Sequence, residues 1–246
     1  MLGRMPRNPR SVEAGLVYHV LNRGNGRMRL FHKDEDFAAF EKVLGEGLER
    51  YPVDLISYCL MGNHWHLIVR PREDRSLSNL MRWVGVTHVR RHHEHYHNRG
   101  GGHLYQGRFK SFPIQEDGHF LRVCRYVEAN ALRAGLVERA EAWRWGAAAA
   151  RSLRLPSGKI QRGKLQQPLR LAAWPVERPA RWTAIINQPA AKDDLEAIRN
   201  SLARGQPFGD CEWVERTAKR LGLMPSPRTR GRPKKNAEVK LNEENE

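Results

Sequence analysis

The chain has 246 residues, of which 43 are Lys or Arg and 27 are Asp or Glu, so its formal net charge is +16. This excess of positive charge indicates a polyanionic partner, with nucleic acid ahead of an anionic membrane surface. No apolar run is long enough to span a bilayer, and the three cysteines form no Cys-x-x-Cys pair. We therefore expect a cytoplasmic, nucleoid-associated protein with no membrane contact and no disulfide framework.

The first 150 residues contain strand and helix signals in alternation. In chain order these signals predict a strand at 15–24, a helix from Asp34 to about Tyr51, a hairpin of strands at 53–60 and 64–70, a helix from Ser76, an interrupted strand at 104–115 and a helix from Asp117 to Gly135. The order β-α-β-β-α-β-α is the ferredoxin-like (split βαβ) pattern of an α+β fold, with one added helix. Pro113 has no amide hydrogen for a neighbouring strand, so we expect the last strand to lie at an edge of the antiparallel sheet.

The remainder of the chain divides into three segments after the predicted domain at 1–150. Residues 151–190 carry 8 Lys or Arg against one acidic residue and lack periodicity, so they are predicted to form a basic linker, either simply solvated or tracking phosphates. Residues 191–224 predict a small helical hairpin that serves as a DNA-binding appendage. Residues 225–246 have few apolar side chains and are expected to be a disordered tail.

Three His-x-His pairs occur among the 11 histidines, and their context separates them. His64 and His66 lie in an apolar strand, where residues i and i+2 point to the same face, so both imidazoles can bind one metal ion. The alternative is two polar residues on a solvent-facing side of the strand. The other two pairs, within residues 92–97, lie in a polar stretch and are interpreted as a solvated, partly basic surface.

A tyrosine and an amide lie one turn apart in the last predicted helix of the domain. Tyr126 and Asn130 are i and i+4, so they share a face, whereas Phe120, Cys124 and Val127 belong to an apolar stripe. Tyr126 is therefore not required for the core, and the amide could supply an oxygen ligand to a hard cation. The alternative is a half-buried tyrosine at the edge of that stripe.

Three segments together resemble the single-tyrosine HUH transposases. MGNHWHLIV (61–69) matches the signature of two histidines around a bulky apolar residue, RYVEANALRAGLV (125–137) resembles the tyrosine helix, and YHVLNRGNGR (18–27) resembles the first strand. The family's common Asn-Pro-x-Arg-Ala pattern here is Asn-Ala-Leu-Arg-Ala, without the proline. The segments RGQPFGDCEWVERTAKRLGL (204–223) and RGRPKK (230–235) are similar to C-terminal additions of the REP-associated tyrosine transposases.

This resemblance implies a transposase that nicks and rejoins single-stranded DNA. Tyr126 would be the catalytic nucleophile that forms a 5′-phosphotyrosine, and His64, His66 and Asn130 would hold Mg²⁺ or Mn²⁺. The implied substrates are single strands with hairpins, such as REP-like palindromes, and the implied protein is a monomer or a homodimer. The competing hypothesis is a domesticated hairpin-DNA-binding protein on the same fold with weak or lost catalysis.

Basic residues outside the metal site are expected to contact DNA. They are Arg23 and Arg108 near strand ends, Arg133 on the tyrosine helix, and Arg230, Arg232, Lys234 and Lys235 in the tail. The tail sequence beginning at Arg230 resembles an AT-hook core, in which a narrow backbone lets arginines enter an A·T-rich minor groove. The alternative is a basic disordered tail without such a contact.

Overall fold

The computed structural model describes residues 12–98, 100–152 and 169–223. Its elements in chain order are β1 (Val17–Arg23), η1 (Asn25–Arg27), α1 (Asp34–Arg50), β2 (Val53–Met61), β3 (His64–Pro71), α2 (Ser76–His95), β4 (Lys110–Ile114), α3 (Gly118–Glu128), α4 (Asn130–Arg133), η2 (Ala140–Ala142), α5 (Ala147–Ser152), α6 (Trp182–Ile186), α7 (Lys192–Arg204) and α8 (Cys211–Arg220). The basic residues of the tail that the sequence selects for DNA binding lie outside the described residues.

Four antiparallel strands form one sheet in the order β2-β3-β1-β4. This is the strand order of the split βαβ fold, so the predicted ferredoxin-like α+β class is confirmed. The register of β1 on β3 places Leu21 opposite His66 and Arg23 opposite His64. Because side chains alternate along a strand, His19 lies on the same face of the sheet as these residues.

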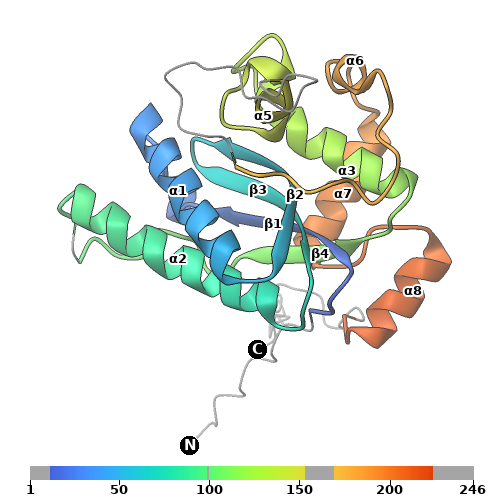
Figure 1. Cartoon of the computed structure of the whole chain (residues 1–246), viewed down its shortest axis with the longest axis horizontal. Coiled ribbons are helices and arrows are strands. Elements are labelled where there is room, and N and C mark those ends of the chain that lie inside the picture. Colours follow the sequence, from blue (N-terminus) through green and yellow to red (C-terminus); the bar gives the residue numbers. More distant parts are fainter. Residues whose placement is uncertain (1–11, 99, 153–168, 224–246) are drawn as a thin grey trace, which may run out of the picture.

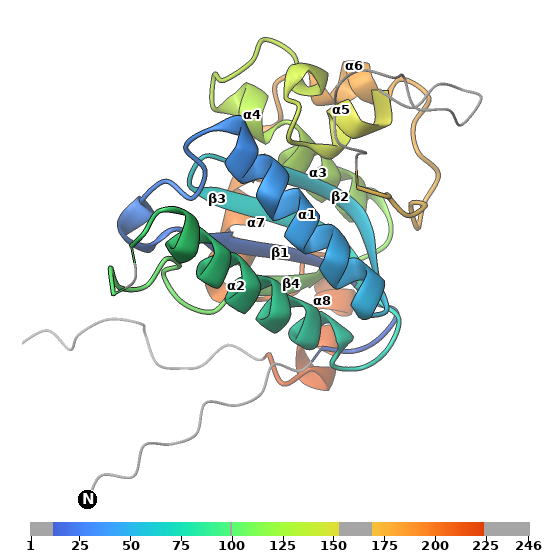
Figure 2. The same ribbon diagram turned by 60° about the vertical axis from the view of Figure 1, so that its left-hand side comes forward.

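Helices cover both faces of the sheet (Figures 1 and 2). α1 and α2 pack on one face, where Phe40 and Trp65 belong to the larger core. α3 packs on the other face with α6 and α7, around a second core that includes Phe112 and Phe120. The helix added to the split βαβ pattern therefore lies across the sheet from the two crossover helices, on the face to which the β3 histidines point.

The helix predicted from Asp117 to Gly135 is interrupted in its middle. Asp117 caps α3 as expected, and Gly135 ends the segment with a φ of 69°. Between them Ala129 separates α3 from α4. The carbonyl of Tyr126, which in a continuous helix would accept the amide four residues later, accepts the guanidinium of Arg133 at 3.0 Å.

Later parts of the chain cover both edges of the sheet. β4 is at one end of the strand order, as Pro113 predicts. The carbonyl of Pro113 accepts a hydrogen bond from the amide of Phe208 at 2.9 Å. At the other end, the carbonyl of Leu55 on β2 accepts the amide of Ala172 at 2.7 Å. The predicted fourth strand is also shorter than expected, because only residues 110–114 of 104–115 pair as a strand.

The described part of the predicted linker is packed against the domain. Trp182 is 2% exposed, and its indole donates a hydrogen bond to Glu128 on α3 at 2.8 Å. The prediction of a solvated or phosphate-tracking basic linker over 151–190 is therefore wrong for residues 169–190. Residues 151–152 end α5, and 153–168 lie outside the described residues. The expected helical pair follows as α7 and α8, and α7 contacts α3 and β4.

Cys59 and Cys124 are buried free thiols and Cys211 is an exposed one. Within the described ranges, no helix is both long and apolar enough to cross a membrane.

Candidate active site

His64 and His66 project from β3 onto the face of the sheet that α3 covers. Their ring centroids are 5.0 Å apart, so strand alternation does bring both imidazoles to one place. His66 is 2% exposed, whereas His64 is only partly buried. The pair thus lies at the boundary between the second core and solvent, where a bound group can reach both rings.

Hydrogen bonds at Nδ1 determine which nitrogen of each ring is free. Nδ1 of His64 lies 2.6 Å from the amide oxygen of Asn63, which can only accept, so His64 donates from Nδ1 and keeps a lone pair on Nε2. Nδ1 of His66 lies 2.8 Å from Nε2 of His19. If His66 donates in this pair, its Nε2 also has a free lone pair, and both rings present the same atom to the site.

Burial keeps these imidazoles neutral. Desolvation, with added repulsion from Arg23 and Arg133, lowers the pKa of His64 to about 4. Desolvation and the neighbouring His19 and His64 rings hold the pKa of His66 well below its usual value. Neutral imidazole is the form that binds metal ions, so the ring nitrogens are in their ligand state at neutral pH.

His19 is a member of the site that the sequence reasoning missed. It is 0% exposed, stacks on His66 with ring centroids 5.0 Å apart, and meets Phe112 edge-on at 5.0 Å. Burial lowers its pKa to about 3. A lone histidine in an apolar strand gives little signal. Alternation along 19, 21 and 23 places it on the face of Arg23, but only the β1–β3 register shows that this is also the face of the His-x-His pair.

Tyr126 extends from α3 toward His66 on β3 and His19 on β1. Its ring centroid is 5.7 Å from that of His66, with the rings nearly perpendicular, and 6.1 Å from that of His19. At 8% exposure it belongs to the second core, which is deeper than the sequence indicated. The side chain of Arg133 hydrogen bonds to the side chain of Tyr126, so the tyrosine hydroxyl meets a positively charged donor.

Two arginines contribute positive charge to the site. The guanidinium of Arg133 lies 4.3 Å from the centroid of the Tyr126 ring and also holds the Tyr126 carbonyl. Arg23 ends β1 opposite His64, and its Nε is buried without a hydrogen-bond partner. Desolvation lowers the pKa of Arg133 from its ordinary value, but arginine is protonated across the physiological range. The charge of both residues therefore faces the place where the tyrosine and the histidines meet.

Asn130 is the first residue of α4, four residues after Tyr126. It is 8% exposed, and its amide nitrogen is buried without a partner. The backbone of the next residue, Ala131, hydrogen bonds to the thiol of Cys59, which pairs with His66 across the β2–β3 hairpin. The start of α4 thus lies over the strand neighbour of a β3 histidine.

The donor set fits a divalent cation with mixed nitrogen and oxygen ligands. In the described part of the chain no three His, Cys, Asp or Glu side chains gather into a metal-binding group. The ligands available here are the free Nε2 of His64, the neutral imidazole of His66 and the buried amide of Asn130, whose hydrogen bonds are incomplete. Such a set would leave coordination positions for water or for phosphate oxygens.

The remaining predicted residues fall outside this group. Arg108 is exposed in the loop before β4, beside α2 on the opposite face of the sheet. The predicted solvated surface at 92–97 is wrong for His92, because α2 continues to His95 and buries that ring against Tyr96, with centroids 4.7 Å apart.

Comparison with known families agrees with this arrangement. Residues 13–130 match the model of the family described as "Transposase IS200 like". Residues 13–130 belong to the IS200-like transposase family. The matched range runs from β1 to the first residue of α4, so this transposase domain contains both β3 histidines, Tyr126 and Asn130.

Solved structures of similar shape include two with related names. One is a REP-associated tyrosine transposase bound to a REP hairpin, with 17% identity and a TM-score of 0.49 over 69% of this chain and 100% of that chain. The other is a protein from Deinococcus radiodurans R1 described as a transposase, with 15% identity and a TM-score of 0.36 over 53% of this chain and 92% of that chain. Likeness at this level assigns no substrate to the transposase domain. No curated protein matches the chain.

Proposed function

We propose that this chain is a metal-dependent endonuclease and strand transferase for single-stranded DNA that forms a 5′-phosphotyrosine at Tyr126. The observation that supports this most directly is the packing of the Tyr126 ring against His66, with centroids 5.7 Å apart in one chain. A tyrosine whose side chain hydrogen bonds to an arginine, together with two neutral imidazoles and a second arginine, is a suitable set for phosphoryl transfer.

The cleavage step follows from the chemistry of a phenol nucleophile. The Tyr126 oxygen attacks phosphorus, the bond from phosphorus to the 3′ oxygen breaks, and the phenolic proton passes through solvent to the departing 3′ hydroxyl. Attack of a 3′ hydroxyl on the phosphotyrosine reverses the step and returns the proton to the tyrosine. No external energy source is needed because one phosphodiester replaces another.

Arg133 would assist this step from beneath the ring. Its guanidinium, 4.3 Å from the ring centroid, favours the negative charge that develops on the tyrosine oxygen, and its bond to the Tyr126 carbonyl fixes it there. Arg23, with a buried unpartnered Nε, is positioned to meet a phosphate oxygen near His64.

A divalent cation would be held by His64, His66 and Asn130, and Mg²⁺ or Mn²⁺ suits this set. When bound, such an ion supplies Lewis-acid polarisation of the scissile phosphate. His19 would act through His66, because accepting a hydrogen bond from its Nδ1 orients the ring and leaves Nε2 toward the ion.

We propose hairpin-containing single strands, such as REP-like palindromes, as the substrate class. The sequence motifs of the REP-associated tyrosine transposases in the C-terminal third support this choice, and so does the strongly positive net charge. The tail residues selected by their AT-hook resemblance, Arg230 and Arg232, would add contacts to duplex DNA beside the hairpin.

The test is formation of a covalent adduct. The full chain is incubated with labelled single-stranded hairpin DNA from the flanks of its own gene, with Mg²⁺ or Mn²⁺, and resolved on a denaturing gel. We expect a labelled protein band that is lost in Tyr126→Phe and in the His64→Ala/His66→Ala double variant. EDTA should also abolish it.

The binding-only hypothesis makes the opposite forecast. If the wild-type chain binds the hairpin tightly but forms no adduct with either metal, catalysis is absent and the chain is a hairpin-DNA-binding protein on the transposase fold. An adduct that survives in Tyr126→Phe would place the nucleophile on another residue.

A further inference from the structure

A groove lies between α2 and the loop at 102–109, on the face of the sheet opposite the β3 histidines. Its volume is about 1130 Å³, above the roughly 300–1,000 Å³ typical of pockets for small ligands. Its floor is mainly apolar and includes Met81, Val86, Val89 and Phe109. An extended ligand with apolar surface would suit it better than a small polar molecule.

The rim of the groove is positively charged. Arg75, Arg82, Arg90 and Arg108 line it and are exposed, and its lining contains no Asp or Glu. In the parts of the chain that the structure describes, none of these four arginines pairs with a carboxylate, although arginines elsewhere on the surface do. Their charge is therefore available to a partner.

The groove face of α2 alternates charge and apolar surface. Arg82, Val86 and Arg90 are spaced four residues apart, so they form one stripe along the helix. The two arginines are about 12 Å apart along the axis, from eight residues at 1.5 Å each. Val86 between them is 66% exposed, one of the few large hydrophobic side chains left uncovered.

We propose that this groove binds a single-stranded segment of DNA, with phosphates on the arginine rim and bases on the apolar floor. A polyanion satisfies the uncompensated charge, and a single strand alone offers unpaired base faces to the floor. A duplex hides its bases, and a peptide made of acidic residues alone has no flat apolar rings to cover Val86.

The groove lies at the same end of the sheet as the candidate active site. Asn22 lines the groove, and the next residue, Arg23, faces His64 across the β1–β3 pair. A strand that leaves the site around the end of β1 would therefore reach the groove. That the bound segment is continuous with the cleaved strand rests on the proposed function, whereas binding by the groove does not.

The test measures binding without cleavage. A fluorescein-labelled dT homopolymer of about 12 nucleotides, within the range of about 4–16 covered by one binding platform, is titrated with the full chain in EDTA, and anisotropy gives Kd at several salt concentrations. Val86→Glu should raise Kd about tenfold or more, because it places a negative charge between two phosphate contacts. Val86→Lys, at the same exposed position, should bind at least as tightly as the wild type.

A double variant tests the rim. Arg82→Ala/Arg90→Ala should weaken binding and reduce the slope of log Kd against log salt by about 1.4, from about 0.7 for each phosphate contact on a single strand. Arg72→Ala/Arg216→Ala removes two exposed arginines outside the groove, which pair with Asp54 and Glu212, and should change Kd little.

Several results would contradict the proposal that the groove binds single-stranded DNA. They are groove variants that bind as tightly as the wild type, equal weakening by Val86→Glu and Val86→Lys, or competition by poly-Glu as effective as that by unlabelled dT. Failure of the catalytic proposal would leave these measurements unchanged, because they record binding of the dT probe in EDTA, where no metal-dependent cleavage contributes to Kd.

Discussion

At the scale of single residues, the site depends on which ring nitrogens are left free. The His-x-His spacing and the i, i+4 pair of Tyr126 and Asn130 could be predicted from the sequence, because each depends on one local period. The partner of His66 could not, since His19 is 47 residues away and meets it only through the β1–β3 register. The burial of Tyr126 likewise follows from tertiary packing.

His19 should control metal affinity through His66. His19→Phe keeps an aromatic ring against Phe112 but removes the hydrogen bond, so Mn²⁺ affinity measured by calorimetry should fall about 10- to 100-fold. His19→Gln, whose amide can still meet Nδ1 of His66, should recover most of it. Thermal unfolding in EDTA should change little for both variants.

The matched control is another buried histidine. His88→Phe removes a hydrogen bond to Tyr105 on the other side of the sheet and should leave Mn²⁺ affinity unchanged. If His19→Phe binds Mn²⁺ as the wild type does, or if Gln and Phe weaken it equally, His19 does not position His66.

At the scale of elements, the strands and the long helices follow their hydrophobic periods. The predictions from the sequence that proved wrong did so because of contacts between distant residues. The break between α3 and α4 coincides with a hydrogen bond from Arg133 to a carbonyl seven residues earlier. Residues 169–190 show no period because they hold to the core through isolated contacts such as that of Trp182 with Glu128. Neither contact leaves a local pattern in the sequence.

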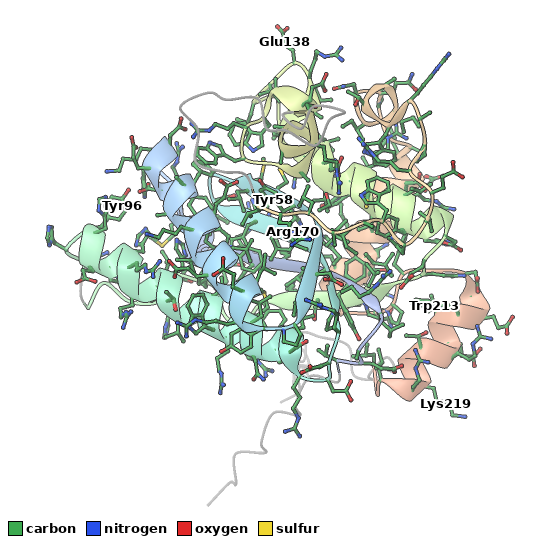
Figure 3. All side chains as sticks on the ribbon, in the orientation of Figure 1. Tyr58, Tyr96, Glu138, Arg170, Trp213 and Lys219 are labelled. Atoms are coloured by element: carbon green, nitrogen blue, oxygen red, sulfur yellow. The ribbon has the colours of Figure 1, made fainter. Side chains whose placement is uncertain are left out.

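The sequence predicts a helix that begins at Asp34, and α1 does begin there, but the carboxylate that holds its start is that of Asp36. Its carboxylate accepts the amides of His32 and Lys33 and, at 2.6 Å, the hydroxyl of Tyr96, which lies at the end of α2 (Figure 3). Burial raises the pKa of Asp36, but these hydrogen bonds outweigh burial and hold the pKa below its usual value. The charged carboxylate therefore ties α1 to α2.

Replacing Asp36 should make stability depend less on pH. Asp36→Asn should lower the free energy of unfolding by about 1–2 kcal/mol at pH 7, because charge-assisted hydrogen bonds become neutral ones. The folded-state pKa is lowered, so this stabilisation is complete above the unfolded-state pKa of about 3.9 and is lost as pH falls through the folded-state value. In urea unfolding, the difference in unfolding free energy between the wild type and Asp36→Asn should be smaller at pH 3 than at pH 7. Asp34→Asn should have a small effect at both pH values. If Asp36→Asn lowers the free energy of unfolding by the same amount at pH 7 and at pH 3, this account is contradicted.

At the scale of the whole molecule, the sheet has both edges covered by its own chain. Phe208 covers β4 and Ala172 covers β2 through backbone hydrogen bonds, so pairing of two sheets edge to edge would require these segments to move. Tyr126 meets His66 of the same chain. We therefore propose a monomer whose tyrosine acts in cis.

A mixing experiment distinguishes cis from trans action. Tyr126→Phe is combined with the His64→Ala/His66→Ala variant, and adduct formation is measured on hairpin DNA. In cis, neither chain has a complete site and the mixture should stay inactive, while light scattering should give the 28.4 kDa mass of one chain. If the mixture forms a quarter or more of the adduct that wild-type chains form at the same total concentration, the tyrosine acts in trans.

The most direct test of the central claim is to locate the DNA on the protein. After reaction with hairpin DNA and a divalent cation, the adduct is digested with nuclease and trypsin, and the modified peptide is identified by mass spectrometry. The account predicts a nucleotide linked to the phenolic oxygen of Tyr126, in the tryptic peptide YVEANALR at 126–133. A nucleotide on any other residue, or unmodified Tyr126 in a chain that has cleaved its substrate, would contradict it.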